Sequence, residues 1–346
     1  MTWRTLQLPP CSLGESPFWH PDEQRLYWVD IAQRCVHRYC PATGAAEQWP
    51  MPSEPGCIAP MRLLPAAARQ GATHSAASGE TNARGTVSNA ADRSPGGHLL
   101  IALRDGVYAA AHWGGPLTRL APALHDVATH RFNDGKADPH GNFWVSTLNE
   151  LRTSASAQLL SLPAGAQPGR AALQVMATGA TVGNGLAWSP DAQTLYWADT
   201  SRHSVRAWDC HARQNTLTDE RIFKQWPAKP AGWHAVPPGN SDHLRLPYAG
   251  RPDGAAVDVA GNYYVAMYEG AQIIKLSAAG VVLASIAVPA QCPTMPCFGG
   301  DDGCTLYVTT ARQNRPAAEL QTYPDSGCVF AMAVNTPGLP VNFYAG

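Results

Sequence analysis

Apolar and polar positions alternate along most of the chain in short runs, which are separated by Gly, Asn, Asp and Pro. Such runs predict short β-strands joined by tight turns. One unit is clear: an apolar strand, a tight turn, an aromatic-rich strand, and a third strand that ends in a polar turn. It reads ESPFW, HPDEQR, LYWVDI, AQR and CVHRYC near the N-terminus, and GLAWS, PDAQ, TLYWADT, SRH and SVRAWD later in the chain. The pattern therefore predicts antiparallel meanders.

The unit recurs at a nearly regular spacing. Asn133 and Asn184 are 51 positions apart, and Asp253 and Gly299 are 46 apart. Periods of about 40–50 residues with four strands each are typical of propeller blades. Six blade starts can be counted, at Glu15, near Cys57, and at Asn133, Asn184, Asp253 and Gly299. We expect an all-β fold, a six-bladed β-propeller, that forms a single domain over residues 1–346.

Two stretches lengthen the repeat. Residues 65–97 are Ala, Ser, Gly and Thr with almost no large apolar side chain, which predicts a flexible insertion that cannot fold alone. Residues 227–248 are rich in Pro and lead directly to Asp253. This second insertion is either a long surface loop or a loop that shapes the mouth of a pocket.

The charge and the cysteines narrow the classes of function. The 25 basic residues balance 26 acidic ones, which gives no reason to expect nucleic acid or an anionic membrane as a partner. No apolar stretch has the length of a signal peptide core or of a membrane span. The nine cysteines form no close CxxC pair and indicate reduced thiols, so we expect a cytoplasmic protein.

Three copies of the unit carry an oxygen-bearing side chain just before their first strand: Glu15, Asn184 and Asp253. The innermost strands of a propeller line a central channel, so these side chains are expected to converge there. Two carboxylates and one amide suit a hard divalent cation, with positions left open for water and substrate. Each residue alone could equally cap a turn, because all three stand in good turn sequences. Their recurrence favours a metal site in the channel.

The segment RFNDGKADPHGNFW adds candidate binding residues. Arg131 and Asn133 are two apart and face the same side of a strand, where they could bind a polyhydroxylated or carbonyl-bearing ligand. Asp134 and Asp138 are expected to have turn and packing roles. The sequence has no nucleophile elbow, phosphate loop, zinc knuckle or HExxH motif. Metal-assisted hydrolysis is therefore favoured, in which a metal polarises a carbonyl and an aspartate takes a proton from water.

Five motifs in order, GESPFW, RFNDGKADPHGNFW, GNGLAWSPD, RPDGAAVD and FGG…LYVTTAR, resemble the gluconolactonase/regucalcin (senescence marker protein) family over about residues 13–312. The resemblance implies a six-bladed propeller with one divalent metal ion (Ca, Zn, Mn or Fe) and hydrolysis of a sugar lactone to the aldonic acid. It implies that Glu15, Asn184 and Asp253 bind the metal and that Asp253 is also the general base. Arg131 and Asn133 match residues that bind the lactone's oxygens.

The chain departs from this family at one position. An acidic residue that contacts the substrate in regucalcin-like members corresponds to Leu151 here, with Glu150 adjacent. We therefore expect a smaller or differently hydroxylated lactone, such as xylono- or arabinonolactone.

Two other functions remain open: a non-catalytic calcium-binding or regulatory propeller, and a hydrolase of aryl esters or phosphotriesters on the same scaffold. The polar pair Arg131 and Asn133 argues against the second, since an apolar ester needs an apolar pocket.

Overall fold

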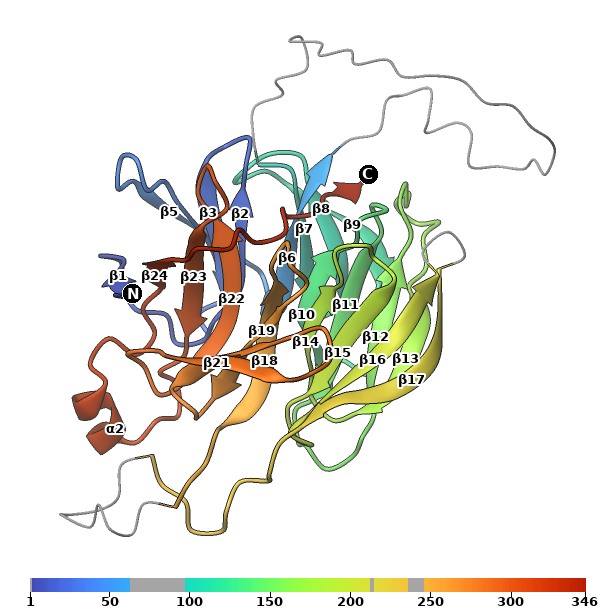
Figure 1. Cartoon of the computed structure of the whole chain (residues 1–346). Helices are drawn as coiled ribbons and strands as arrows, with labels where there is room; N and C mark the ends of the chain where they lie inside the picture. The colour runs from blue at the N-terminus through green and yellow to red at the C-terminus, as the bar shows by residue number, and fades with distance from the viewer. Residues whose placement is uncertain (1, 63–96, 212–214, 236–245) are drawn as a thin grey trace.

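The structure, a computed structural model, describes residues 2–62, 97–211, 215–235 and 246–346. Its strands form six small sheets that are arranged in a ring (Figure 1). We call each sheet a blade and number the blades in chain order. The predicted all-β, six-bladed propeller is confirmed.

The first three blades follow the chain order from the inside of the ring outward. Blade 1 contains β2 (Gly14–His20), β3 (Arg25–Asp30), β4 (Cys35–Tyr39) and β5 (Ala46–Pro50). Blade 2 contains β6 (Cys57–Arg62), β7 (Leu99–Leu103), β8 (Gly106–Ala110) and β9 (Leu117–Pro122). Blade 3 contains β10 (His130–Ala137), β11 (Phe143–Asn149), β12 (Ala157–Leu162) and β13 (Gln174–Ala180).

The remaining blades repeat the same order. Blade 4 contains β14 (Gly183–Trp188), β15 (Thr194–Asp199), β16 (Ser204–His211) and β17 (Thr216–Gln225). Blade 5 contains β18 (Arg251–Val257), β19 (Tyr263–Tyr268), β20 (Gln272–Leu276) and β21 (Val282–Ala287). Blade 6 contains β22 (Pro293–Gly299), β23 (Thr305–Thr310) and β24 (Phe330–Ala333), with β1 (Arg4–Thr5) as its outer strand.

Both ends of the described chain contribute to the ring. The N-terminal strand β1 pairs antiparallel with β24, so blade 6 combines segments from opposite ends of the sequence. At the other end, β25 (Tyr344–Ala345) pairs in parallel with β6 and adds a fifth strand to blade 2. The inner strands pack side by side around the ring, and β22 contacts β2 where the ring closes.

One predicted blade start is wrong. Gly299 is the last residue of the inner strand β22, which begins at Pro293. Pro293 and Pro296 lie within this strand, and prolines in a run argue against a strand assignment from sequence. All seven residues of β22 are nevertheless buried, because the strand lies on the inside of the ring.

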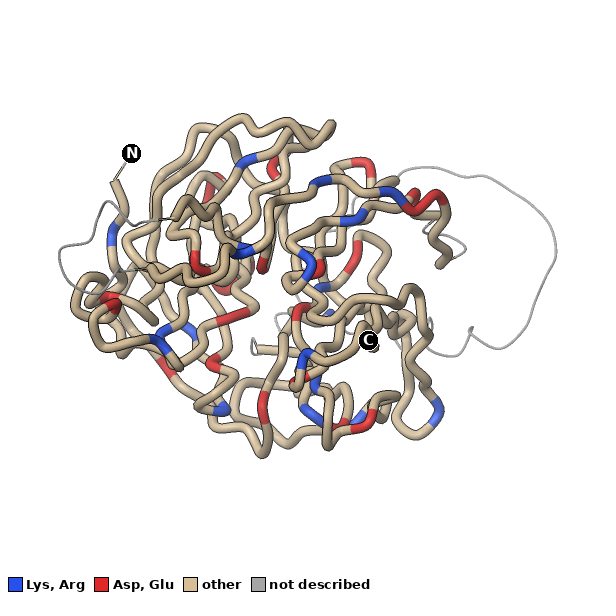
Figure 2. The backbone as a smooth tube through the Cα atoms, turned by 90° about the horizontal axis from the view of Figure 1, so that it is seen from below, with Lys and Arg blue, Asp and Glu red and all other residues tan. Residues whose placement is uncertain are grey.

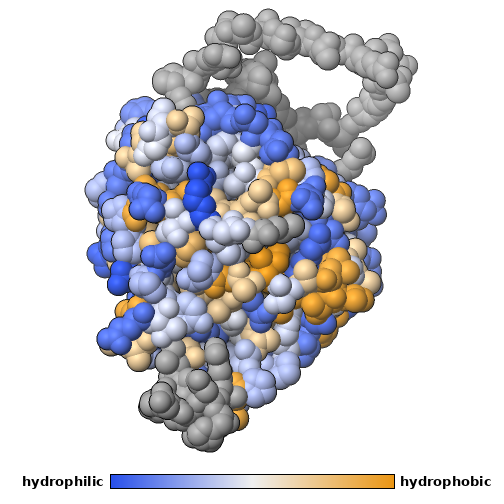
Figure 3. Space-filling model, turned by 60° about the vertical axis from the view of Figure 1, so that its left-hand side comes forward, coloured by the Kyte–Doolittle hydropathy of each residue, from blue (hydrophilic) through white to orange (hydrophobic). Residues whose placement is uncertain are grey.

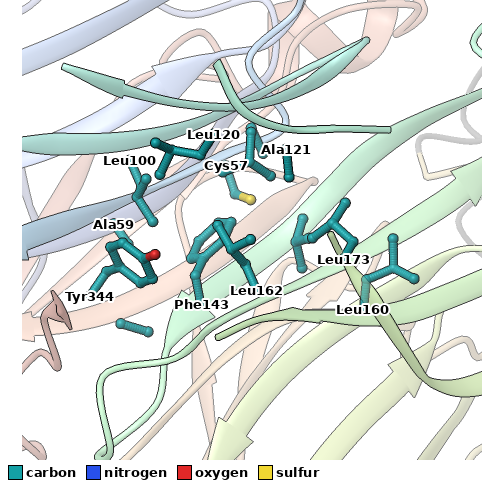
Figure 4. Close-up of a cluster of buried hydrophobic side chains, with 14 of the residues drawn as sticks. Cys57, Ala59, Leu100, Leu120, Ala121, Phe143, Leu160, Leu162, Leu173 and Tyr344 are labelled. Atoms are coloured by element: carbon teal, nitrogen blue, oxygen red, sulfur yellow. The ribbon is translucent and has the colours of Figure 1, made fainter. Parts of the chain in front are cut away.

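Hydrophobic side chains pack between neighbouring blades. Between blades 2 and 3, side chains from the inner to the outer strands pack together, and Tyr344 joins them from the C-terminal segment (Figure 4). Phe132, Phe143 and Leu100 are at most 1% exposed in this cluster. Burial of one such side chain contributes about 2 kcal/mol. This packing holds the inner strands in place.

Aspartates close equivalent turns in two blades. Asp138 accepts hydrogen bonds from the backbone of His140 and Asn142 and from the indole of Trp144. Asp258 accepts the corresponding backbone hydrogen bond from Asn262 in blade 5. The predicted turn and packing role of Asp138 is confirmed.

The insertions lie only partly within the described residues. Of residues 65–97, only Gly97 is described, so the expected flexible insertion lies outside them. The described parts of 227–248 contain no strand, but Trp233 is buried and its ring lies 5.0 Å from that of Tyr248. Tyr248 in turn shares a 2.7 Å hydrogen bond with His203, directly before β16, so this part of the Pro-rich loop is packed against blade 4.

Helix and surface features complete the fold. In the ranges that the structure describes, α2 (Ala317–Thr322) has six residues, and no helix is long and apolar enough to cross a membrane. On the face shown in Figure 3, hydrophilic positions predominate and hydrophobic ones form smaller groups.

All nine cysteines are free thiols, as predicted, and Cys292 and Cys297 are both buried.

Candidate functional site

The candidate site lies at the end of the channel where the inner strands begin. Figure 2 shows the ring from this end, with several acidic positions around its centre. Glu15 on β2, Asn133 on β10, Asn184 on β14 and Asp253 on β18 are all between 3% and 8% exposed. Four blades therefore place buried polar side chains on their inner strands, near the same end of the channel.

A β-bulge occurs in each of these four strands. The register shifts between Glu15 and Phe18, between Asn184 and Ala187, between Pro252 and Ala255, and between Phe132 and Gly135. In each case, the inner strand advances by three residues where its partner advances by two, so the inner strand holds one extra residue. A bulge bends the strand and redirects the side chains next to it. The shared bulge explains why these blades present polar side chains at the same end of the channel.

The bulges also show that the three predicted metal-binding residues are not strictly equivalent. Glu15 and Asn184 stand at the first position of their bulges, whereas Pro252 has that place in blade 5 and Asp253 follows it. The residues after Glu15 and Asn184 are Ser16 and Gly185, which have φ values of 49° and 60°. Asp253 and Asn133 thus share the second position. Two different bulge positions supply the side chains of the site.

A chain of hydrogen bonds joins blades 3, 4 and 5. Arg131 Nη1 donates to Asn133 Oδ1 (2.9 Å), and Asn133 Nδ2 donates to Asn184 Oδ1 (2.7 Å). Asn184 Nδ2 donates to Thr200 Oγ1 (2.8 Å), whose hydroxyl donates to the carbonyl oxygen of Pro252 (2.7 Å). The chain therefore runs from Arg131 to the residue before Asp253.

Thr200 fixes the orientation of the Asn184 amide. A hydroxyl has one hydrogen, and that of Thr200 is donated to Pro252. Thr200 can then only accept from Asn184, so the amide nitrogen faces Thr200 and the amide oxygen faces Asn133. The oxygen keeps a second lone pair for another ligand.

The two carboxylates of the site are poorly compensated. Burial raises the pKa of Glu15 well above its usual value, and the negative charges of Asp253 and Asp134 raise it further. Burial also raises the pKa of Asp253 to about 8, although the positive charge of Arg251 opposes this effect. Within the described residues, Asp253 accepts no hydrogen bond and Glu15 accepts only a 3.4 Å bond from the backbone of Ser16. Carboxylates buried in this way are costly unless a cation compensates them.

Asp134 and Lys136 extend the polar cluster further into the channel. Asp134 Oδ2 accepts a hydrogen bond from the backbone of Leu186 (2.7 Å), whereas its Oδ1 is buried without a partner among the described residues. The ammonium group of Lys136 donates to the carbonyl oxygen of Ala255. Burial lowers the pKa of Lys136, and the negative charge of Asp134 opposes that shift. Asp134 therefore joins blade 3 to blade 4 and also contributes charge to the site.

Arg104 binds two acidic side chains, Glu54 and Glu150, and we call these three residues the rim of the site. The sequence patterns did not point to Arg104. Its guanidinium holds Glu150 through two bonds of 2.9 and 3.0 Å and also binds Glu54 at 3.1 Å. Glu150 lies 4.0 Å from Arg131. Leu151 is 69% exposed. Glu150 is thus engaged with Arg104 and cannot simply replace the acid that is missing at Leu151.

The residues fit a cation whose ligands are oxygen atoms. The described part of the chain brings together no cluster of three His, Cys, Asp or Glu that could hold a metal ion. A cation here would depend on the amide oxygen of Asn184 beside the carboxylates of Glu15 and Asp253. Such mixed oxygen sets suit Ca²⁺ and related hard ions. The unpaired buried carboxylates are the structural observation that favours this fit.

The nearby thiol is not a nucleophile. Burial raises the pKa of Cys57 well above its usual value, and the charges of Asp134 and Glu15 raise it further. The reactive thiolate is therefore disfavoured.

A cavity of about 240 Å³ occupies the opposite half of the channel. All six inner strands line it, mainly with apolar side chains, and the C-terminal segment 339–342 also lies against it. Lys136 lines this cavity, whereas Glu15, Asn184 and Asp253 do not. The channel therefore has a polar half and an apolar half.

Known proteins resemble this chain over most of its length. Residues 13–83 and 68–312 match the model of the SMP-30/Gluconolactonase/LRE-like region. A 6-deoxy-6-sulfogluconolactonase of Pseudomonas putida is 36% identical over 97% of this chain and 96% of its own length. A pentonolactonase of Haloferax volcanii is 28% identical over 95% and 94%.

Solved structures support the fold. A calcium-binding regucalcin from Agrobacterium tumefaciens superimposes with a TM-score of 0.77 at 22% identity, covering 99% of this chain and 97% of that one.

Proposed function

Because the chain belongs to the SMP-30/gluconolactonase/LRE-like family, we propose that it is a lactonase that hydrolyses a sugar lactone to the aldonic acid. Two relatives that match this chain over nearly their whole length are lactonases by name, which supports the reaction class. The observation that carries the proposal is the pair of buried, poorly compensated carboxylates Glu15 and Asp253, together with the fixed amide of Asn184.

In this proposal, Glu15, Asn184 and Asp253 hold one divalent cation. Ca, Zn, Mn and Fe are the candidates, since a set of oxygen ligands accepts several divalent ions. When bound, the cation supplies a Lewis acid that polarises the lactone carbonyl and stabilises negative charge on its oxygen.

Arg131 and Asn133 orient the substrate. Arg131 Nη1 is already bound to the backbone oxygen of Phe132 and to Asn133, which fixes the guanidinium in place. Its remaining N–H groups can donate to the hydroxyl oxygens of a sugar lactone. Preorganised donors of this kind hold a substrate in a reactive geometry.

Asp253 is the proposed general base. In its ionised form the carboxylate accepts a proton from water as that water attacks the lactone carbonyl; the bond between the carbonyl carbon and the ring oxygen then breaks, and the proton passes to the departing ring oxygen. Asp253 suits this role because no described residue occupies its oxygens with a hydrogen bond. We also place the protein in the cytoplasm in this proposal, for which the nine free thiols are the support.

A lactone panel tests the proposal. Protein freed of metal with a chelator is supplied with Ca²⁺, Zn²⁺, Mn²⁺ or Fe²⁺, and acid release is followed with a pH indicator. The panel contains gluconolactone, xylonolactone, arabinonolactone and an aryl ester. We expect metal-dependent hydrolysis of at least one sugar lactone and little hydrolysis of the ester. Metal binding without turnover of any lactone would instead favour a calcium-binding propeller.

A substitution tests the assignment of the base. We expect Asp253→Asn to lower kcat by a factor of about 10² or more. Asp209→Asn, at a half-exposed position on the outer part of blade 4, is the matched control and should leave kcat unchanged. Near-normal turnover by Asp253→Asn on every active lactone would refute the role.

A further inference from the structure

Three arginines lie at the end of the propeller where the inner strands begin. Arg131 comes from β10, Arg251 begins β18, and Arg152 stands in the turn between β11 and β12. The antiparallel pairing of His130 with Asn149 brings the end of β11, and with it the turn that carries Arg152, to the end of the channel where β10 begins. Three cationic residues therefore stand at the same end of the blades as the buried carboxylates Glu15 and Asp253.

Arg152 is held in a defined turn. Its backbone has a φ of 54° and donates to the oxygen of Asn149 (3.0 Å), which closes the turn. The backbone of Glu150 donates to the oxygen of Thr129 (3.0 Å) and anchors the same turn to the neighbouring loop. A left-handed conformation is costly for a residue with a side chain. Its presence here fixes where the Arg152 side chain leaves the backbone.

The guanidinium of Arg152 has no hydrogen bond or ion pair with any residue of the described ranges. The adjacent acid does not neutralise it, because Glu150 is bound to Arg104 through both carboxylate oxygens. The residue between them, Leu151, is uncharged and exposed. Arg152 thus presents an unmatched positive charge at this end of the propeller.

Arg251 also has spare donor capacity. It lies 3.3 Å from Glu269, but Lys229 and Arg315 bind the same carboxylate at 2.9 and 3.0 Å. The Nε of Arg251 is buried and has no hydrogen-bond partner among the described residues. Three cations therefore share one carboxylate, and a buried N–H group stays unpaired, which is costly in a protein without a ligand.

We propose that Arg152 and Arg251 bind an anionic substituent of the lactone, a sulfonate or phosphate on the carbon farthest from the ring carbonyl. The inference rests on the proposed lactonase function and adds the charge of the substrate. Arginine suits such a group because its planar N–H donors match two oxygens of a tetrahedral oxyanion. The buried Glu15 and Asp253 lie deeper, where the lactone carbonyl would be.

The first experiment compares substrates that differ in a single group. The metal-loaded protein is assayed on gluconolactone and on the same lactone with a sulfonate or with a phosphate at carbon 6. We expect kcat/KM for at least one anionic lactone to exceed that for the neutral lactone by about tenfold, as for a hydrogen bond to a charged group. The two anionic substrates show whether the site prefers a sulfonate or a phosphate. Raising the ionic strength should reduce the preference, because salt screens exposed charges.

Variants assign the preference to this end of the propeller. Arg152→Gln should lower the anionic-to-neutral ratio of kcat/KM about tenfold, and Arg152→Lys should retain most of it. Leu151→Glu, at an exposed position, should lower the same ratio by adding a negative charge. Arg170→Gln is the control, because Arg170 is an exposed arginine in the loop between β12 and β13, at the other end of the blade. It should leave both rates unchanged.

The outcomes separate the two proposals. Hydrolysis of all lactones at equal rates, or an anionic preference that Arg152→Gln leaves unchanged, overturns the anionic subsite and leaves the lactonase proposal standing. Failure to hydrolyse any lactone overturns both. Thermal unfolding of each variant shows whether a loss reflects the site or the fold.

Discussion

Asn133 donates a hydrogen bond of 2.7 Å from its Nδ2 to Oδ1 of Asn184. The two residues come from neighbouring blades and are 51 positions apart in the sequence. In the proposed site, Asn133 contacts the substrate and Asn184 contacts the cation. This bond therefore connects the two halves of the proposed chemistry, and any change that rotates one amide also disturbs the other.

Replacing Thr200 with Val should weaken metal binding by about 10- to 100-fold, as substitutions behind metal ligands do. The hydroxyl that orients the Asn184 amide is lost, and the carbonyl oxygen of Pro252 loses its donor. Isothermal titration calorimetry of the metal-free protein measures the effect directly. Thr200→Ser keeps the hydroxyl and should bind the metal nearly as tightly as the original protein. Equal metal affinities of the Val and Ser variants would contradict the positioning role.

Replacing Gly185 with Ala should destabilise the fold by about 2–3 kcal/mol. Gly185 has a φ of 60°, and an added Cβ would lie 2.5 Å from the hydroxyl oxygen of Tyr263, which itself donates to the Gly185 carbonyl. Gly179 has a similar φ of 82° but no neighbour within 4 Å of such a Cβ. Gly179→Ala thus isolates the backbone strain, about 1 kcal/mol. Urea unfolding of both variants separates strain from crowding; equal losses would rule out a contribution from Tyr263.

Replacing Arg104 with Gln should raise KM about tenfold and leave the affinity for the metal unchanged. Arg104 holds Glu150 beside Arg131, and its loss frees the rim that positions the Arg131 guanidinium. Small displacements of a positioning group have large kinetic effects. Steady-state kinetics with a metal titration on the same preparation test this. An unchanged KM would show that Arg131 needs no support from the rim.

The stability that Glu269 contributes should depend on pH. Burial alone would raise its pKa, but Arg251, Lys229 and Arg315 outweigh this effect and hold the pKa of Glu269 below its usual value. A carboxylate with a lowered pKa stabilises the fold above its unfolded pKa of about 4.3, and this contribution disappears as the pH falls through the folded pKa. Glu269→Gln should therefore lower Tm at pH 7, and the difference from the original protein should shrink below about pH 4. A Tm difference that stays constant over this range would contradict the ion-pair account.

The repeated unit was sufficient to predict the propeller, because its apolar runs correspond to inner strands that the ring buries. Glu15, Asn184 and Asp253 do lie on three inner strands near one end of the channel, as the pattern predicted. Their roles as metal ligands and base remain predictions. The one-residue offset of Asp253 was not predictable from spacing, because a bulge changes the register without changing the alternation of residue types.

Thr200 is marked in the sequence by a departure from the repeat. LYWVDI in blade 1 and LYWADT in blade 4 are equivalent, and each aspartate accepts hydrogen bonds from the backbone that leads into its inner strand. Thr200 therefore occupies the place of the apolar Ile31. A polar residue where the repeat is apolar elsewhere marks a special contact. Arg104 carried no such mark, because its partners Glu54 and Glu150 lie about 50 positions away on either side.

The closure of blade 6 by β1 has a mechanical consequence. Only two residues, Arg4 and Thr5, pair with β24; the β25–β6 pair in blade 2 is equally short, and the other strand pairs extend over four or more residues. A force applied to the N-terminus would break the short β1–β24 pairing before the pairings of any other sheet. The load would then pass to residues 6–13, which hydrogen-bond to blade 6 at Val329, Gly327 and Ala311 and lead directly to Glu15 on β2, so the candidate site would be the next part of the ring to lose its geometry.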